Sequence, residues 1–116
     1  MLSHLDYLHH VFMIKQREKR KLSVSAFNSS DLLLLNEILY NLLHNSFQLS
    51  DKTKSLLKRY AKWIRKFVAY KSNTYRRNVM VKHPTIFTKI FRTVLPLTKE
   101  YFQKHQKGIS EEKNAE

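Results

Sequence analysis

The fold is decided by residues 30–43, which read SDLLLLNEILYNLL. The Ser30 hydroxyl is suited to accept from the first unpaired backbone amides of a helix, and Asp31 complements the positive end of the helix dipole. Apolar residues then occupy nearly the whole circumference through Leu43. Such a helix is buried in a core or in a dimer interface. The sequence therefore predicts a central helix that begins at Ser30, with a homodimer through Leu32–Leu43 as an alternative use of it.

The composition around this helix favours an all-α fold. The chain has 116 residues, 42% of them hydrophobic, with one glycine and two prolines. So few turn-forming residues argue against a β-sandwich or barrel, whose tight turns need positive φ angles. We expect a small bundle of four to five helices with a basic face.

The longest helix is predicted over residues 51–70, after a break at residues 45–49. Ser50 and Asp51 repeat the capping chemistry that starts the central helix. At 100° per residue, apolar and basic side chains separate onto opposite sides. The apolar stripe is Leu56, Leu57, Tyr60, Ile64, Phe67 and Val68, and the basic stripe is Lys54, Lys58, Arg59, Lys62, Arg65 and Lys66. Trp63 lies at the border, where an indole either seals the edge of the core or stacks on a base.

Shorter helices are expected before and after these two. Residues 1 to about 16 predict an amphipathic helix, which places Leu5, Leu8 and Phe12 on one side. It runs into a basic cluster, residues 15–21, of the kind found in nuclear-localisation signals. Residues 23–30 read as a connector.

The C-terminal half predicts two further helices. Residues 71–82 read as a turn and a short helix, with Asn73 as a cap. Its inward side chains are expected to be Tyr75, Val79 and Met80, and its outward ones Arg76, Arg77 and Lys82. Pro84 ends that helix, and the next begins at Thr85. Pro96 should kink or divide it, and it should continue to about residue 106 with Gly108 near its C-cap.

These elements predict one compact domain with two appendages. The N-terminal amphipathic helix and basic cluster span residues 1–22, a single helical domain spans residues 30–107, and residues 108–116 form a disordered acidic tail. The chain contains no cysteine, and its six histidines are scattered. We therefore expect no disulfide, no metal site and no cofactor.

The charge is concentrated in residues 52–92, which hold thirteen Lys or Arg and no acid, whereas the remainder of the chain is neutral. An uncompensated field of one sign is typical of proteins that bind a polyanion, most often nucleic acid. The candidate contacts are Lys54, Lys58, Arg59, Lys62, Arg65, Lys66, Lys71, Arg76, Arg77 and Lys82, with Trp63 as a candidate for base stacking.

Residues 38–97 resemble the short basic proteins that are encoded by Polinton or Maverick elements and their adenovirus-like relatives. The similarity lies in the stretch Asn41-Leu-Leu-His-Asn-Ser-Phe-Gln-Leu-Ser50, in residues 72–77 and in the apolar stretch 87–97. It also includes the Leu-Lys-Arg and Ile-Arg core formed by Lys54, Leu57, Lys58, Arg59, Ile64 and Arg65. Pro84 and Thr85 stand where that family usually has a Gly-Gly pair. The resemblance implies a virion core protein of a viral or transposable element that condenses DNA.

Catalysis is not expected, because no carboxylate, histidine and nucleophile stand in an arrangement that predicts a reaction. The favoured function is sequence-independent binding of nucleic acid, DNA before RNA. A helix-turn-helix in which Lys52, Lys54 and Lys58 enter the major groove is one alternative. Another is a membrane-active or protein-interaction module that uses the aromatic helix 85–102 on anionic lipid. Because no signal peptide is visible, we expect an intracellular protein, in the nucleus or a virion, that is not secreted.

Overall fold

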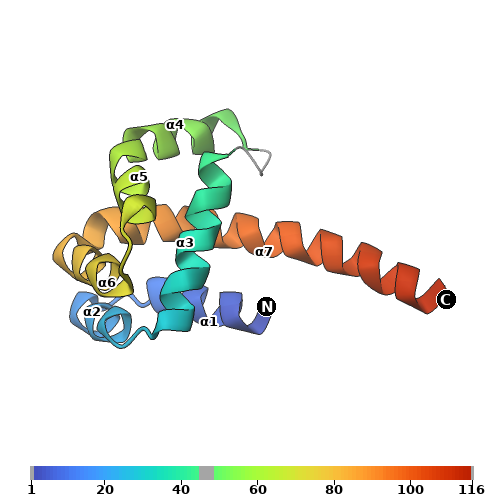
Figure 1. The fold of residues 1–116 in the computed structure, drawn as a ribbon, viewed down its shortest axis with the longest axis horizontal. Helices are drawn as coiled ribbons and strands as arrows, with labels where there is room; N and C mark the ends of the chain where they lie inside the picture. Colours follow the sequence, from blue (N-terminus) through green and yellow to red (C-terminus); the bar gives the residue numbers. More distant parts are fainter. Residues whose placement is uncertain (1, 45–48, 116) are drawn as a thin grey trace.

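The computed structural model describes residues 2–44 and 49–115, and the side chains of residues 2–44 and 49–104. Seven helices and no strand lie in these ranges, which confirms the all-α class (Figure 1). The helices are α1 (Leu2–Phe12), α2 (Arg17–Ser25), α3 (Ser29–Leu43), α4 (Asp51–Arg59), α5 (Ala61–Ala69), α6 (Asn73–Lys82) and α7 (Pro84–Ala115). The predicted four to five helices were too few. The single long helix expected over residues 51–70 is divided into α4 and α5. The connector expected at residues 23–30 contains the end of α2 and the start of α3.

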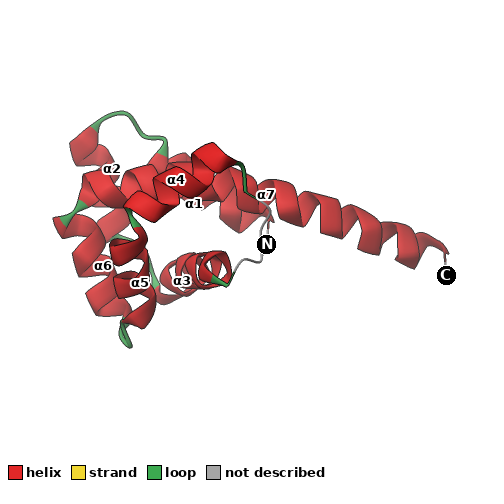
Figure 2. Cartoon of the chain, turned by 90° about the horizontal axis from the view of Figure 1, so that it is seen from above, coloured by secondary structure: helices red, strands yellow, loops and turns green. Residues whose placement is uncertain are grey.

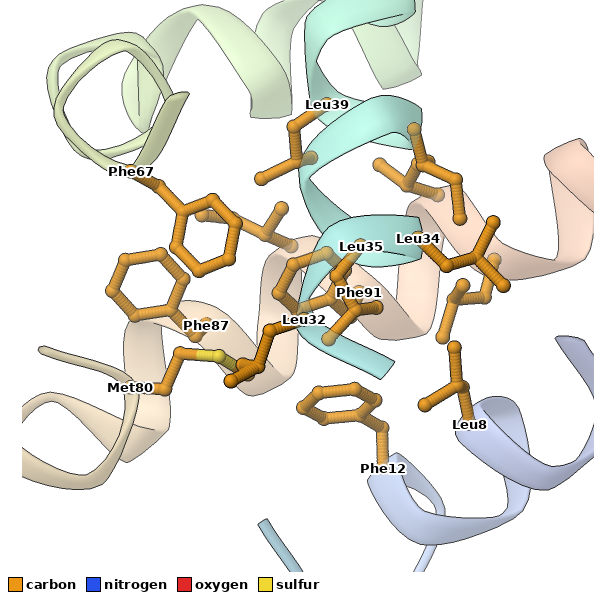
Figure 3. Close-up of a cluster of buried hydrophobic side chains, with 14 of the residues drawn as sticks. Leu8, Phe12, Leu32, Leu34, Leu35, Leu39, Phe67, Met80, Phe87 and Phe91 are labelled. Atoms are coloured by element: carbon orange, nitrogen blue, oxygen red, sulfur yellow. The ribbon is translucent and has the colours of Figure 1, made fainter. Parts of the chain in front are cut away.

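The core forms around α3 and the first half of α7. Helices α5 and α6 pack against α3, α1 packs along α7, and α2 packs against α6. Leu32, Leu35 and Leu39 of α3 are fully buried, together with Phe67 of α5 and Phe91 of α7 (Figure 3). Burial of each such side chain stabilises the fold by about 2 kcal/mol. Because α3 is buried against both α5 and α6, its predicted role as the central helix is confirmed.

The outer side of α3 is less apolar than the sequence suggests. Its exposed large hydrophobic side chains are Leu33 and Tyr40. The other leucines of Leu32–Leu43, on which the predicted homodimer was based, pack in or against the core of a single chain. The homodimer stays a prediction.

Helix α3 begins one residue earlier than predicted, and its cap is Asn28 in place of Ser30. The Asn28 side-chain oxygen accepts from the Asp31 N–H at 2.9 Å, and an Asp31 carboxylate oxygen accepts from the Asn28 N–H at 3.0 Å. This reciprocal capping box satisfies two backbone amides, whereas Ser30 alone would satisfy one. His4 Nε2 of α1 lies 2.7 Å from the other oxygen of the buried Asp31 carboxylate. The start of α3 is therefore tied to α1.

The predicted helix over residues 51–70 is interrupted at Tyr60. Ser50 caps α4 as expected, but Tyr60 leaves the regular helical conformation with φ −104° and ψ 12°. In Figure 1, α4 runs across the top of the molecule and α5 turns downward from it. An unbroken helix of this length would be about 30 Å long, as long as the molecule is wide (29 Å). The bend lets Leu57 of α4 and Ile64 and Phe67 of α5 all reach the core.

Side chains of α1 and α2 belong to the same core as those of the remaining helices. Leu5, Leu8 and Phe12 are buried as predicted, but α1 ends at Phe12, before the expected residue 16. Arginines satisfy the carbonyls left free at this end. Arg92 Nε donates to the Phe12 carbonyl at 2.6 Å, and Arg20 Nη1 donates to the Ile14 carbonyl at 2.8 Å. Two cations at the negative end of α1 also complement its dipole.

Helix α7 is longer than the sequence predicts. Pro84 occupies its first position, where a missing N–H costs nothing, and Pro96 does not divide it. The helix continues through Gly108 to Ala115, past the predicted C-cap near Gly108. The disordered tail at residues 108–116 stays a prediction. A single glycine costs a helix only about 1 kcal/mol relative to alanine, which is not enough by itself to end it. The last turns extend away from the other helices (Figure 2).

A cluster of three side chains joins α1 to α7 and is expected to make stability depend on pH. Lys99 Nζ lies 3.1 Å from His9 Nδ1 and 3.0 Å from an Asp6 carboxylate oxygen. Because an ammonium group only donates, His9 Nδ1 must accept and carries no proton. Burial and the neighbouring Lys99 lower the pKa of His9 below the ordinary value of 6.5, against a smaller opposing effect of Asp6.

As the pH is lowered below about 6.5, the free energy of unfolding should therefore decrease. In that window the unfolded chain takes up a proton on His9 that the folded protein resists, and the loss ends once the pH passes the lowered pKa. His9→Asn keeps an acceptor near the Nδ1 position and should remove this part of the slope. Urea denaturation of both proteins at about pH 8 and about pH 5.5 measures it. Equal slopes in the two proteins would contradict the assignment to His9.

Candidate nucleic-acid interface

Six of the predicted contact residues lie on α4 and α5, and all six are exposed. They are Lys54, Lys58 and Arg59 of α4 and Lys62, Arg65 and Lys66 of α5; we call them the α4–α5 cations. Their outward position follows from the apolar residues between them, because Leu57, Ile64 and Phe67 are buried and fix the opposite side of each helix. The bend at Tyr60 changes the direction of the helix but leaves these cations in solvent.

The α4–α5 cations have no carboxylate partner among the described side chains. The ion pairs in those ranges join His4 to Asp31, Lys99 to Asp6 and Lys104 to Glu100. All three lie on α1, α3 and α7. The positive charge of α4 and α5 is therefore left for solvent or for a partner.

Trp63 is half-buried and packs against the start of α7. Its ring centroid lies 4.4 Å from that of His83 and 6.2 Å from that of Phe87. The Lys66 ammonium lies 5.4 Å from the indole centroid, at a distance typical of cation–π contact. These contacts match a role in sealing the core edge. Base stacking by Trp63 stays a prediction.

Arg76 is not a surface residue, and the prediction that it faces outward was wrong. Only 6% of the surface of Arg76 is exposed to solvent. Its guanidinium donates to the Phe67 carbonyl at 3.2 Å, to the Asn73 side-chain oxygen at 2.7 Å and to the Tyr70 carbonyl. The end of α5 presents carbonyls without helical partners, and an arginine with five N–H donors satisfies several of them at once. Arg76 therefore closes the turn between α5 and α6.

Helix α6 is rotated relative to the prediction. Tyr75, expected to face inward, is 64% exposed and stacks beside Tyr70 at a centroid distance of 6.0 Å. Val79 and Met80 are buried as expected. Burying Arg76 turns the preceding residue, Tyr75, toward solvent, because neighbours on a helix point about 100° apart.

The remaining predicted contacts are dispersed. Lys71 is exposed in the turn between α5 and α6, and Lys82 is exposed at the end of α6. Arg77 is half-buried, and its guanidinium donates twice to the Phe27 carbonyl, from Nε at 3.1 Å and from Nη2 at 2.8 Å. Arg77 therefore links α6 to the segment between α2 and α3.

Lys21 lies beside these residues, although no pattern in the sequence predicts that position. Lys21 and Ser25 of α2 line a groove together with Arg77, Asn78, Val81 and Lys82 of α6. Lys21 lies in the basic cluster that resembles a localisation signal, more than fifty residues before Arg77. No signal in the sequence connects the two, because only the packing of α2 on α6 brings them together.

Other kinds of site find no support in the described residues. No group of three or more His, Asp or Glu side chains within those ranges is placed to hold a metal ion. None of the helices there combines the length and the apolar composition needed to cross a membrane. Comparison with protein families, with curated proteins and with solved structures finds no match to this chain. The resemblance to Polinton and adenovirus-like proteins therefore stays a prediction.

Proposed function

We propose that this protein binds nucleic acid without sequence specificity, through phosphate contacts made by the α4–α5 cations. The observation that carries the proposal is that six exposed Lys and Arg side chains on two adjacent helices lack any described carboxylate partner. Cations that pair with no carboxylate among the described side chains can bind the phosphates of a polyanion, and binding is favoured by the release of its condensed counterions. Lys and Arg reach phosphate oxygens readily on flexible stems, and Arg also binds them with two parallel hydrogen bonds.

The residues between the cations support phosphate contact over base reading. Residues 51–70 contain no Asn and no Gln, the side chains that read adenine in the major groove. The large apolar side chains of residues 51–70 pack in or against the core. A helix-turn-helix that specifies a sequence therefore has few side chains with which to do so.

Duplex DNA is the proposed partner, and packaging of a viral or transposable-element genome is the biological setting that the family resemblance implies. Such a role places the protein in the nucleus or in a virion. Both the partner and the setting rest on the charge pattern and on the resemblance.

The membrane-active alternative is disfavoured by the packing of α7. Its apolar residues in the stretch 85–102 include Phe87, Ile90, Phe91, Val94 and Leu95, all of which are buried in the core. Inserting that stretch into lipid would require removing these side chains from the core, and the Phe12 and Phe67 rings that now pack against Phe91 and Phe87 would be exposed. Binding through the α4–α5 cations needs no such rearrangement.

The salt dependence of affinity tests the proposal. For phosphate contact, the logarithm of the association constant should fall linearly with the logarithm of the salt concentration, with a slope near −0.9 for each contacted phosphate. If all six α4–α5 cations bind phosphates, the slope should be about −5. Fluorescence anisotropy with two unrelated duplexes of equal length measures it. A slope near zero, or a large preference for one duplex, would contradict sequence-independent binding.

A further inference from the structure

The groove between α2 and α6 combines several donors. Its lining consists of Lys21 and Ser25 from α2 and Arg77, Asn78, Val81 and Lys82 from α6, around a volume of about 500 Å³. Three of these residues are cationic, and the Asn78 amide adds another donor. Glu18, the acid of α2, does not line the groove. The groove is therefore suited to an anionic group.

Arg77 is held in place before any ligand arrives. Its Nε and Nη2 groups both donate to the Phe27 carbonyl, which fixes the plane of the guanidinium. The Nη1 group has no acceptor among the described contacts, so its two N–H bonds are available. A donor that is already oriented loses less entropy when it binds than a free side chain does. The free Nη1 group of Arg77 can therefore donate to a phosphate oxygen without breaking its bonds to Phe27.

Helix α4 and helix α2, which forms one wall of the groove, lie at opposite ends of the globule. In Figure 1, α4 is at the top of the globule and α2 is at the bottom. A straight duplex laid along α4 would therefore run across the top of the globule, whereas α2 lies at its bottom. Bending one duplex around the protein costs free energy, whereas a second segment can enter the groove without being bent.

We propose that the groove between α2 and α6 is a second phosphate-binding site, and that it holds the backbone of a second nucleic-acid segment. One protein molecule then bridges two segments. The inference rests on the proposed function, because the first segment is bound by the α4–α5 cations. It adds a site, with Lys21, Arg77 and Lys82 as its cations.

Two kinds of variant change the charge of the groove and are expected to leave the fold intact. Lys21→Gln combined with Lys82→Gln removes two exposed cations and leaves Arg77 on the Phe27 carbonyl. Ser25→Asp places a carboxylate in the groove and keeps all three cations, and Ser25→Asn is its neutral control. Lys19→Gln combined with Lys104→Gln removes the same charge from exposed residues that neither line the groove nor belong to the α4–α5 cations.

Bridging is measured as capture of a labelled duplex by an immobilised duplex of different sequence, with the protein present in limiting amount. The affinity for one short duplex is measured in parallel by anisotropy. We expect the double groove variant and Ser25→Asp to lose capture by about tenfold and to keep the affinity for the short duplex within about twofold. The control variants should capture as the wild type does.

Any of three results would overturn the inference. Unchanged capture by both groove variants would mean that bridging, if present, arises elsewhere, for example in a dimer. A loss of short-duplex affinity as large as the loss of capture would mean that the groove and the α4–α5 cations form one continuous surface. A wild-type protein that binds no duplex contradicts the proposed function, whereas one that binds but does not capture contradicts only the bridging inference.

Discussion

Replacing Lys58, Lys62 and Lys66 with glutamate is expected to weaken binding of duplex DNA by about three orders of magnitude at low salt. The substitutions remove three of the six α4–α5 cations and place three anions beside the phosphates. All three side chains are exposed, so the fold should persist and the circular dichroism spectrum should not change. The slope of the logarithm of the association constant against the logarithm of the salt concentration should also become less negative, by about 0.9 for each of the three lost phosphate contacts. Anisotropy titrations of the variant and the wild type at several salt concentrations test both expectations.

A matched variant distinguishes position from net charge. Lys15, Lys19 and Lys104 are exposed and lie outside both α4 and α5. Replacing these three with glutamate changes the net charge by the same amount, but should weaken binding far less because charges distant from the phosphates are screened by salt. If the two triple variants lose affinity equally, the bulk charge of the protein drives binding, and the α4–α5 cations are not a defined interface.

Replacing Arg76 with alanine is expected to lower the free energy of unfolding by about 3 kcal/mol. The substitution leaves the Phe67 and Tyr70 carbonyls and the Asn73 side-chain oxygen without this donor. It also removes the guanidinium from beside the Phe67 ring, at 6.0 Å from its centroid. Burial lowers the pKa of Arg76, yet arginine stays charged through the physiological range, so the effect should not depend on pH near neutrality. Urea denaturation followed by circular dichroism measures the loss.

Arg59→Ala is the control for Arg76→Ala, because Arg59 is exposed on α4. It should change the free energy of unfolding by no more than about 0.5 kcal/mol and should instead weaken DNA binding. The opposite pattern, with Arg76→Ala impairing binding at unchanged stability, would restore Arg76 to the interface where the sequence alone would place it.

The sequence by itself determined the features that depend on neighbours along the chain. The spacing of Leu57, Ile64 and Phe67 identified which side of residues 51–70 is buried, since helical periodicity couples residues three and four apart. The same spacing placed the six α4–α5 cations in solvent. The scarcity of glycine and proline predicted the all-α class, and the run of leucines in residues 32–43 identified the central helix.

Only the tertiary structure decided the features that depend on partners distant in sequence. The bend at Tyr60 arises because two short helices cover the core where one straight helix would pass over it. Arg76 turns inward because the carbonyls at the end of α5 need a donor. Lys21 meets Arg77 only through the packing of α2 on α6. A helical pattern states which residues share a side of one helix, but the surface that they face is set by the helices packed against it.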